Sequence, residues 1–182
     1  TLLAPVAKSK GAQRLRVYLG LDDLPGFPRH GISGDLARAA DVSSAAVSIE
    51  MGKVRDRWRQ TSSRELGVLK RVYSLLEKAL AENFPVLSLS RAAALVLEGF
   101  PREPDLTDDA ASRAAEALVR AVTELDAEHL DGPEGLRLKW RRTSPNAPVL
   151  IAWERPAFDV VDRLGEKADV LVAKHQVFAE AT

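Results

Sequence analysis

Hydrophobic residues recur every three or four positions through most of this chain, which is the period of an amphipathic helix. The most informative stretch covers residues 33–58, SGDLARAADVSSAAVSIEMGKVRDRW. Ser33 and Ser43 are suited to cap two successive helices, because a serine hydroxyl satisfies a free backbone N–H at a helix start. The second helix has apolar residues at spacings of four, three and four, which places them on one face. These residues are Val47, Met51, Val54 and Trp58.

The two helices are joined closely enough to form a helix-turn-helix. Ala37 is small where the helices must cross, and Asp41 stands at the corner, where glycine is usual but Asp tolerates a left-handed backbone. The outer side of the second helix is small and uncharged at Ser44, Ala45 and Ser48. Such a surface can approach DNA closely, and the second helix of this motif usually lies in the major groove. The alternative is an ordinary antiparallel helix pair.

Three more helices are predicted after residue 60. Ser62 and Glu65 form a capping box at the start of the first, a shorter helix covers residues 89–97, and Thr107 caps the third. Residues 13–21, before the motif, fit either a short helix or a strand. The positions expected to face the core are Leu66, Leu69, Tyr73, Leu76 and Leu80, then Leu89, Ala93, Val96 and Leu97, then Ala111, Ala115, Leu118, Val122 and Leu125.

The hydrophobic period changes to two near residue 136. Apolar Leu136, Leu138 and Trp140 alternate there with basic Arg137, Lys139 and Arg141. A second apolar run covers residues 149–153, and two such runs around a turn predict a β-hairpin. Pro156 opens a last predicted helix. Three helices followed by a hairpin is the order of a winged helix, so we predict a mainly α chain with a helix-turn-helix unit over residues 1–60 and a winged-helix unit with a C-terminal helix over residues 61–182.

The charge of the chain is zero in total but uneven along its length. Residues 1–60 hold ten Lys and Arg against six Asp and Glu, residues 61–135 hold eight against fourteen, and residues 136–155 hold five against one. Two basic blocks therefore flank an acidic middle. The basic residues of the predicted hairpin would form a stripe about 15 Å long, suited to a phosphate backbone. The alternative is the solvated face of an ordinary strand.

No constellation of catalytic residues is visible. The chain has no cysteine, no G-x-S-x-G motif and no phosphate-binding glycine loop. His30, His129 and His175 lack the spacing of metal ligands, so we expect no metal and no cofactor. No apolar run approaches the roughly 20 residues of a membrane span, and we expect a cytoplasmic protein. The start at Thr1 suggests a fragment of a longer protein.

Several segments together resemble the C-terminal region of the serine/threonine kinase of bacterial phage growth limitation and BREX defence systems. They are LGLDDLPG, DLARAADVSSAAVS and KVRDRWRQ in the first third, then LSLSRAAALVLEGF, LRLKWRR, VLIAW and LGEKADVL. In that family a helix-turn-helix related to the promoter-reading region of sigma factors precedes a tryptophan at the place of Trp58. The sequence departs from the family at Asp41 and at Ile49-Glu50, where polar-then-small residues are more usual.

The resemblance implies a parent protein that phosphorylates serine or threonine during defence against phage. No kinase lysine loop, H-R-D or D-F-G occurs here, so the kinase domain would lie upstream. This portion would sense or dock, with double-stranded DNA as the expected partner and other defence-system proteins as further partners. Two alternatives are a protein-interaction platform and a stand-alone transcriptional regulator. The predicted DNA-binding residues are Ser33, Ser43, Ser44, Ala45, Ser48, Lys53, Arg55, Arg137, Lys139, Arg141 and Arg142.

Overall fold

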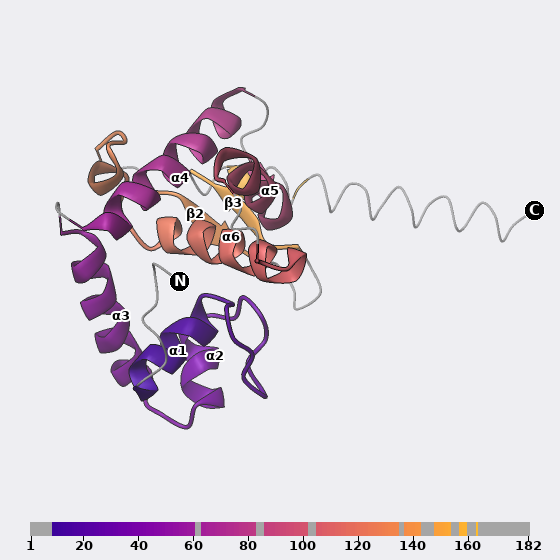
Figure 1. The fold of residues 1–182 in the computed structure, drawn as a ribbon. Coiled ribbons are helices and arrows are strands. Elements are labelled where there is room, and N and C mark those ends of the chain that lie inside the picture. The colour runs from indigo at the N-terminus through magenta and orange to yellow at the C-terminus, as the bar shows by residue number, and fades with distance from the viewer. Residues whose placement is uncertain are drawn as a thin grey trace, which may run out of the picture.

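The chain is mainly helical and carries one small antiparallel sheet (Figure 1). The computed structural model describes residues 9–60, 63–82, 86–101, 105–134, 137–142, 148–153, 157–159 and 163. Within these residues, no helix is both long enough and apolar enough to cross a lipid bilayer.

The N-terminal part consists of α1 (Lys10–Tyr18), α2 (Ser33–Ala39) and α3 (Ser44–Trp58). Residues 13–21, whose pattern fitted either a helix or a strand, are therefore helical as far as Tyr18. At the corner between α2 and α3, Asp41 has a φ of 49°, in the left-handed region that its side chain tolerates. The Val42 N–H donates to the carbonyl of Ala37 at 3.0 Å, which closes the turn.

One of the two predicted serine caps is present and the other is wrong. Ser43 caps α3, since its hydroxyl accepts from the N–H of Ala46 at 3.1 Å. Ser33 is instead the first residue of α2, and the residue at the cap position is Ile32. The carboxylate of Asp35 accepts from the N–H of Ile32 at 3.1 Å, so the longer acidic side chain reaches back to the helix start.

Between residues 63 and 153, the described part of the chain contains three α-helices and three strands, with a short 3₁₀ turn η1 (Ala127–Leu130) after the last of these helices. In chain order the other elements are α4 (Arg64–Glu82), β1 (Val86–Ser88), α5 (Leu89–Gly99), α6 (Asp108–Thr123), β2 (Lys139–Arg141) and β3 (Leu150–Ala152). The predicted hairpin of β2 and β3 forms, and β1 pairs with the other side of β3. The strand order is β1-β3-β2, and all pairs are antiparallel.

The sequence pattern missed β1 because the strand merges into a helix cap. Ser88 is both the last residue of β1 and the N-cap of α5, where its hydroxyl accepts from the N–H of Arg91 at 3.2 Å. A second prediction also needs correction, since Leu97 points outward and is 40% exposed. The buried face of α5 runs through Leu89, Ala92, Ala93 and Val96, and Leu97 lies about 100° around the helix from Val96.

Three sequence predictions lie partly outside the described residues. The capping box was assigned to Ser62, and in the structure the hydroxyl of Ser63 accepts from the N–H of Leu66 at 3.0 Å. Leu136 belongs to the predicted first strand but is not described. The helix predicted from Pro156 is helical at residues 157–159 and 163, and its remainder is outside the described part.

A single hydrophobic core runs through both parts of the chain. It includes Leu15 and Leu36 from the N-terminal helices, Leu69 from α4 and Ile151 from β3. Trp58, the last residue of α3, is fully buried where this helix leads into α4. The two predicted units therefore share apolar contacts.

Truncating Trp58 tests this shared core. Trp58→Ala is expected to lower the free energy of unfolding by about 3–5 kcal/mol, the usual cost of removing a buried aromatic side chain. Urea denaturation followed by circular dichroism measures the change. Lys53→Ala on the same helix is the control, because Lys53 is exposed and its truncation is expected to cost less than about 0.5 kcal/mol. Equal denaturation midpoints for the two variants would contradict the shared core.

Candidate nucleic-acid interface

The outer face of α3 is exposed along its first three turns. Helix α3 lies at one edge of the molecule, with α1 and α2 against its inner side (Figure 1). Its inner face buries Val47 and Met51 against them. The outer face consists of Ser44, Ala45, Ser48, Ile49 and Lys53, all exposed, together with half-buried Gly52. This set, the α3 face, contains four of the predicted DNA-binding residues.

The five exposed residues of the α3 face and Gly52 include no acid, and two acids of the same helix border them. Asp56 is exposed one turn beyond Gly52 and pairs with Arg59 at 3.5 Å, while Glu50 is turned toward α1. Glu50 accepts two hydrogen bonds from the guanidinium of Arg14 on α1, one from Nε at 2.8 Å and a second from the terminal nitrogen. The hydrogen bonds from Arg14 lower the pKa of Glu50, and its charge is compensated within the fold. Glu50 thus joins α3 to α1 and leaves the first three turns of the outer surface neutral to positive, with Asp56 beyond them.

Arg55, the next basic residue predicted to bind DNA, is engaged inside the protein. Its guanidinium donates to Glu124, at the C-terminal end of α6, at 3.0 Å. Arg137 reaches the same carboxylate at 4.0 Å, and its Nε donates to the carbonyl of Thr123 at 3.0 Å. The structure therefore brings Arg55 of α3 and Arg137 of the predicted hairpin together. They meet around the buried carboxylate of Glu124 and not on the outer surface.

The basic stripe of the hairpin is shorter than its alternation suggested. Lys139 and Arg141 are exposed on one side of β2, while Trp140 between them is half-buried on the other. Arg141 lies 4.0 Å from the carboxylate of Asp159, and Arg142 donates to the carbonyl of Arg29 at 3.3 Å. Among the described residues of the hairpin, Lys139 and Arg141 are cations with exposed side chains.

A buried polar cluster links α1 to α6 and was not anticipated from the sequence. The Tyr18 hydroxyl donates to Glu124 at 2.6 Å, beside the hydrogen bond from Arg55. The Arg120 guanidinium lies between two rings, 3.8 Å from the centroid of Tyr18 and 4.0 Å from that of Trp140. It also donates to the carbonyl of Gly31 at 2.7 Å. One arginine therefore contacts α1, the loop before α2, and β2.

Burial sets the protonation behaviour of this cluster. Arg120 is 3% exposed, and its burial lowers the pKa of the guanidinium, while burial raises the pKa of the Tyr18 hydroxyl. The cation nevertheless stays charged, since arginine loses its proton far above neutral pH. In the sequence, the residue that could have indicated this cluster is Arg120. It is a cation on the side of α6 that also carries apolar residues. An apolar stripe interrupted by a cation indicates a buried partner for that cation.

The loop before α2, which contains Gly31, also contacts α6 at other residues. Glu116 accepts from Arg29 at 2.7 Å and lies 3.3 Å from His30, and Arg113 pairs with Asp23 at 3.1 Å. With the contact of Arg120 to Gly31, these pairs follow α6 over two turns. Residues 23–31 therefore lie along one face of this helix.

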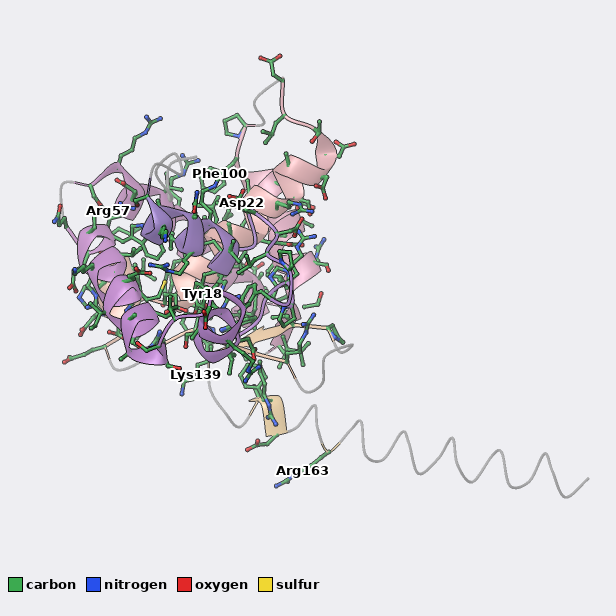
Figure 2. All side chains as sticks on the ribbon, turned by 90° about the horizontal axis from the view of Figure 1, so that it is seen from below. Tyr18, Asp22, Arg57, Phe100, Lys139 and Arg163 are labelled. Carbon is green, nitrogen blue, oxygen red and sulfur yellow. The ribbon has the colours of Figure 1, made fainter. Side chains whose placement is uncertain are left out.

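A groove lies at the other end of α6 and has a volume of about 970 Å³. Its lining includes apolar Val68, Val96, Leu97 and Phe100, with Asp22 at one side. In Figure 2, Asp22 and Phe100 lie on one side of the molecule and Lys139 on the opposite side. The groove and the hairpin therefore present separate surfaces.

One group of side chains has the composition of a metal site. The possible ligand atoms of Asp126, Glu128 and His129 lie within 4.8 Å of one another. Asp126 pairs with Arg59 at 3.4 Å, and Glu128 lies 3.8 Å from Nδ1 of His129. The Nδ1 atom of His129 has no hydrogen-bond partner among the described residues.

Comparison of the chain with protein-family models, with curated proteins and with solved structures finds no match.

Two buried tyrosines provide a matched test of the cluster around Glu124. Tyr18→Phe keeps the ring beneath Arg120 and deletes the hydroxyl donor to Glu124, so it is expected to cost about 1.5–3 kcal/mol of stability. The Tyr73 hydroxyl is also buried but has no hydrogen-bond partner among the described residues. Tyr73→Phe is therefore expected to leave stability unchanged or to raise it. Equal losses for the two variants in urea denaturation would contradict the role of the Tyr18 hydroxyl.

The pair of Glu50 and Arg14 predicts a dependence of stability on pH. Because the folded protein lowers the pKa of Glu50, the pair stabilises the fold above the unfolded pKa, and this contribution is lost as pH falls through the folded pKa. Glu50→Gln is expected to destabilise the protein at neutral pH by less than about 1 kcal/mol, since solvent screens the pair. The difference from the parent should shrink below about pH 4.

Denaturation midpoints at several pH values measure this difference. Glu98→Gln is the control, because Glu98 is exposed on α5 and far from Arg14 in the chain. A deficit of Glu50→Gln that stays constant from neutral to acidic pH would show that the side chain acts through packing and not through its charge.

Proposed function

We propose that this chain binds double-stranded DNA and places α3 in the major groove. The observation that carries the proposal is the α3 face, which is exposed and consists of small residues around Ile49 with one lysine and no acid within it. The Asp41 corner and the Ser43 cap set its angle to α2. A helix presented in this way matches the second helix of a helix-turn-helix.

We further infer that residues 63–153 form a winged helix. The order α4-β1-α5-α6-β2-β3 and the strand order β1-β3-β2 support this assignment. In a winged helix the helix before the hairpin would be the usual reader of DNA, and here that helix is α6. Residues 23–31 lie along α6 and pair with Arg113, Glu116 and Arg120. The unobstructed α3 is therefore the better reading helix.

Lys139 and Arg141 would contact phosphates beside the site read by α3. Both are exposed on the hairpin, and phosphate contacts position a protein without reading sequence. Arg137 and Arg55 meet at Glu124, which fixes the start of the hairpin relative to α3. The acidic middle of the chain would face away from the duplex, since like charges repel. The kinase parent stays a prediction from the resemblance, with this region holding it on DNA.

Salt dependence separates phosphate contacts from base contacts. Lys139→Ala and Arg141→Ala are expected to weaken all duplexes alike and to reduce the slope of log affinity against log salt by about 0.9 for each lost contact. Fluorescence anisotropy at several salt concentrations measures this. Lys78→Ala on α4 is the matched control, because Lys78 is also exposed and lies outside the proposed interface. An unchanged slope for both hairpin variants would show that the hairpin is exposed to solvent and does not contact phosphates.

A charge placed on the α3 face tests the reading helix. Ser48→Glu is expected to lower duplex affinity at least tenfold, because it puts a carboxylate among phosphates and base edges. Ser90→Glu is its control, being the same change at an exposed helical serine on α5. Both variants should keep the melting temperature of the parent within a few degrees. Equal affinity of Ser48→Glu and the parent would rule α3 out as the reading helix.

The groove beside α6 favours a second candidate function, the docking of a partner protein. Leu97 is 40% exposed at its wall, and Phe100 adds an aromatic surface next to Asp22. Arg16 pairs with Asp22 at 2.6 Å, so the apolar wall is the part of the groove that suits a partner, and it suits the apolar face of an amphipathic helix. Selection of peptides by the whole chain, compared with selection by Leu97→Asp, tests this function. A parent that binds no duplex at low salt but enriches such peptides would be a docking module.

A further inference from the structure

Ile49 is a large apolar side chain that α3 leaves in solvent. It is 59% exposed, whereas Val47 and Met51 on either side of it in sequence are buried. Ala45 precedes it by one turn and Lys53 follows it by one turn, so it lies at the centre of the α3 face. The packing of α3 does not use this side chain, and its exposed apolar surface is unfavourable until something covers it.

The surroundings of Ile49 favour close approach by a large, negatively charged partner. Ala45 is small, and a side-chain carbon added at Gly52 would meet nothing within 4 Å. Lys53 supplies a positive charge, and the neighbouring acid Glu50 is paired with Arg14 on the inner side. Asp56, the next exposed acid on this side, lies two turns from Ile49 and pairs with Arg59 at 3.5 Å. An apolar centre whose nearest neighbours are small or positive is suited to a surface that combines phosphates with an apolar group.

The major groove of DNA offers one such apolar group, the C5 methyl of thymine. We propose that Ile49 packs against a thymine methyl and makes the site prefer a T·A pair beneath the middle of α3. This assignment rests on the proposed function and deepens it, because it names the base that the α3 face recognises.

Removing the thymine methyl alone gives a direct test. A duplex is first selected from a random library with the whole chain, and each thymine is then replaced in turn by deoxyuridine, which keeps the pairing with adenine. The parent is expected to lose about three- to fivefold in affinity at one or two of these positions, the worth of one buried methyl group. Anisotropy titration of each duplex measures the loss.

The variant Ile49→Ala should bind the selected duplex more weakly and should show no further loss with deoxyuridine at those positions. Ile32→Ala is the matched control, because Ile32 is 63% exposed but lies before α2 and outside the α3 face. Its response to deoxyuridine should equal that of the parent. Both variants should have the same melting temperature as the parent, since neither side chain is buried.

The outcomes separate this inference from the proposed function. A selected duplex whose affinity for the parent is the same with every deoxyuridine overturns the assignment of Ile49 and leaves DNA binding intact. A loss with deoxyuridine that persists unchanged in Ile49→Ala also overturns it. Failure of the parent to select any duplex at low salt overturns both the assignment and DNA binding.

Discussion

The position of α3 depends on a single buried cation. The Arg120 guanidinium lies between the rings of Tyr18 and Trp140 and donates to the carbonyl of Gly31, so it contacts α1, the loop before α2, and the hairpin at once. A buried cation is costly unless it is compensated, and the two ring faces and the carbonyl compensate part of that cost, while Nε and one terminal nitrogen have no hydrogen-bond partner among the described residues. Tyr18 then extends the contact to Glu124, and Glu124 holds Arg55 on α3. The first three helices are thereby fixed on the rest of the fold.

The same contacts explain how a chain of zero net charge can present a basic surface. Several charges of both signs are used internally, among them Arg55, Glu116 and Glu124. Charged side chains that stay exposed on the α3 face and on the hairpin include Lys53 and Lys139, which are both positive. The charge that a ligand meets is therefore set by which acids the fold turns inward. A count along the sequence cannot give that quantity, because pairs such as Arg29 with Glu116 join residues 87 positions apart.

The sequence predicted the elements whose cause is local. The helical period, the Ser43 cap, the left-handed Asp41 corner and the hairpin each depend on a few neighbouring residues, and each is present. The α3 face followed from the same period. The cluster around Arg120 could not be predicted, because its partners come from residues 18, 31 and 140. For the same reason the engagement of Arg55 and Arg137 by Glu124 needed the tertiary structure.

The burial of Trp58 fixes the C-terminal end of α3 in the core. The helix has 15 residues and is about 22 Å long, with its last residue held in the core and its first turn at the far end. A rotation of about 5° about the buried end would move Ser44 by about 2 Å, which is enough to break a hydrogen bond to a base edge. Under the proposed function, loosening of the core around Trp58 would therefore change how the far end of α3 meets a duplex. The buried aromatic side chain holds the C-terminal end of the helix, so its packing would set how precisely the first turn is placed.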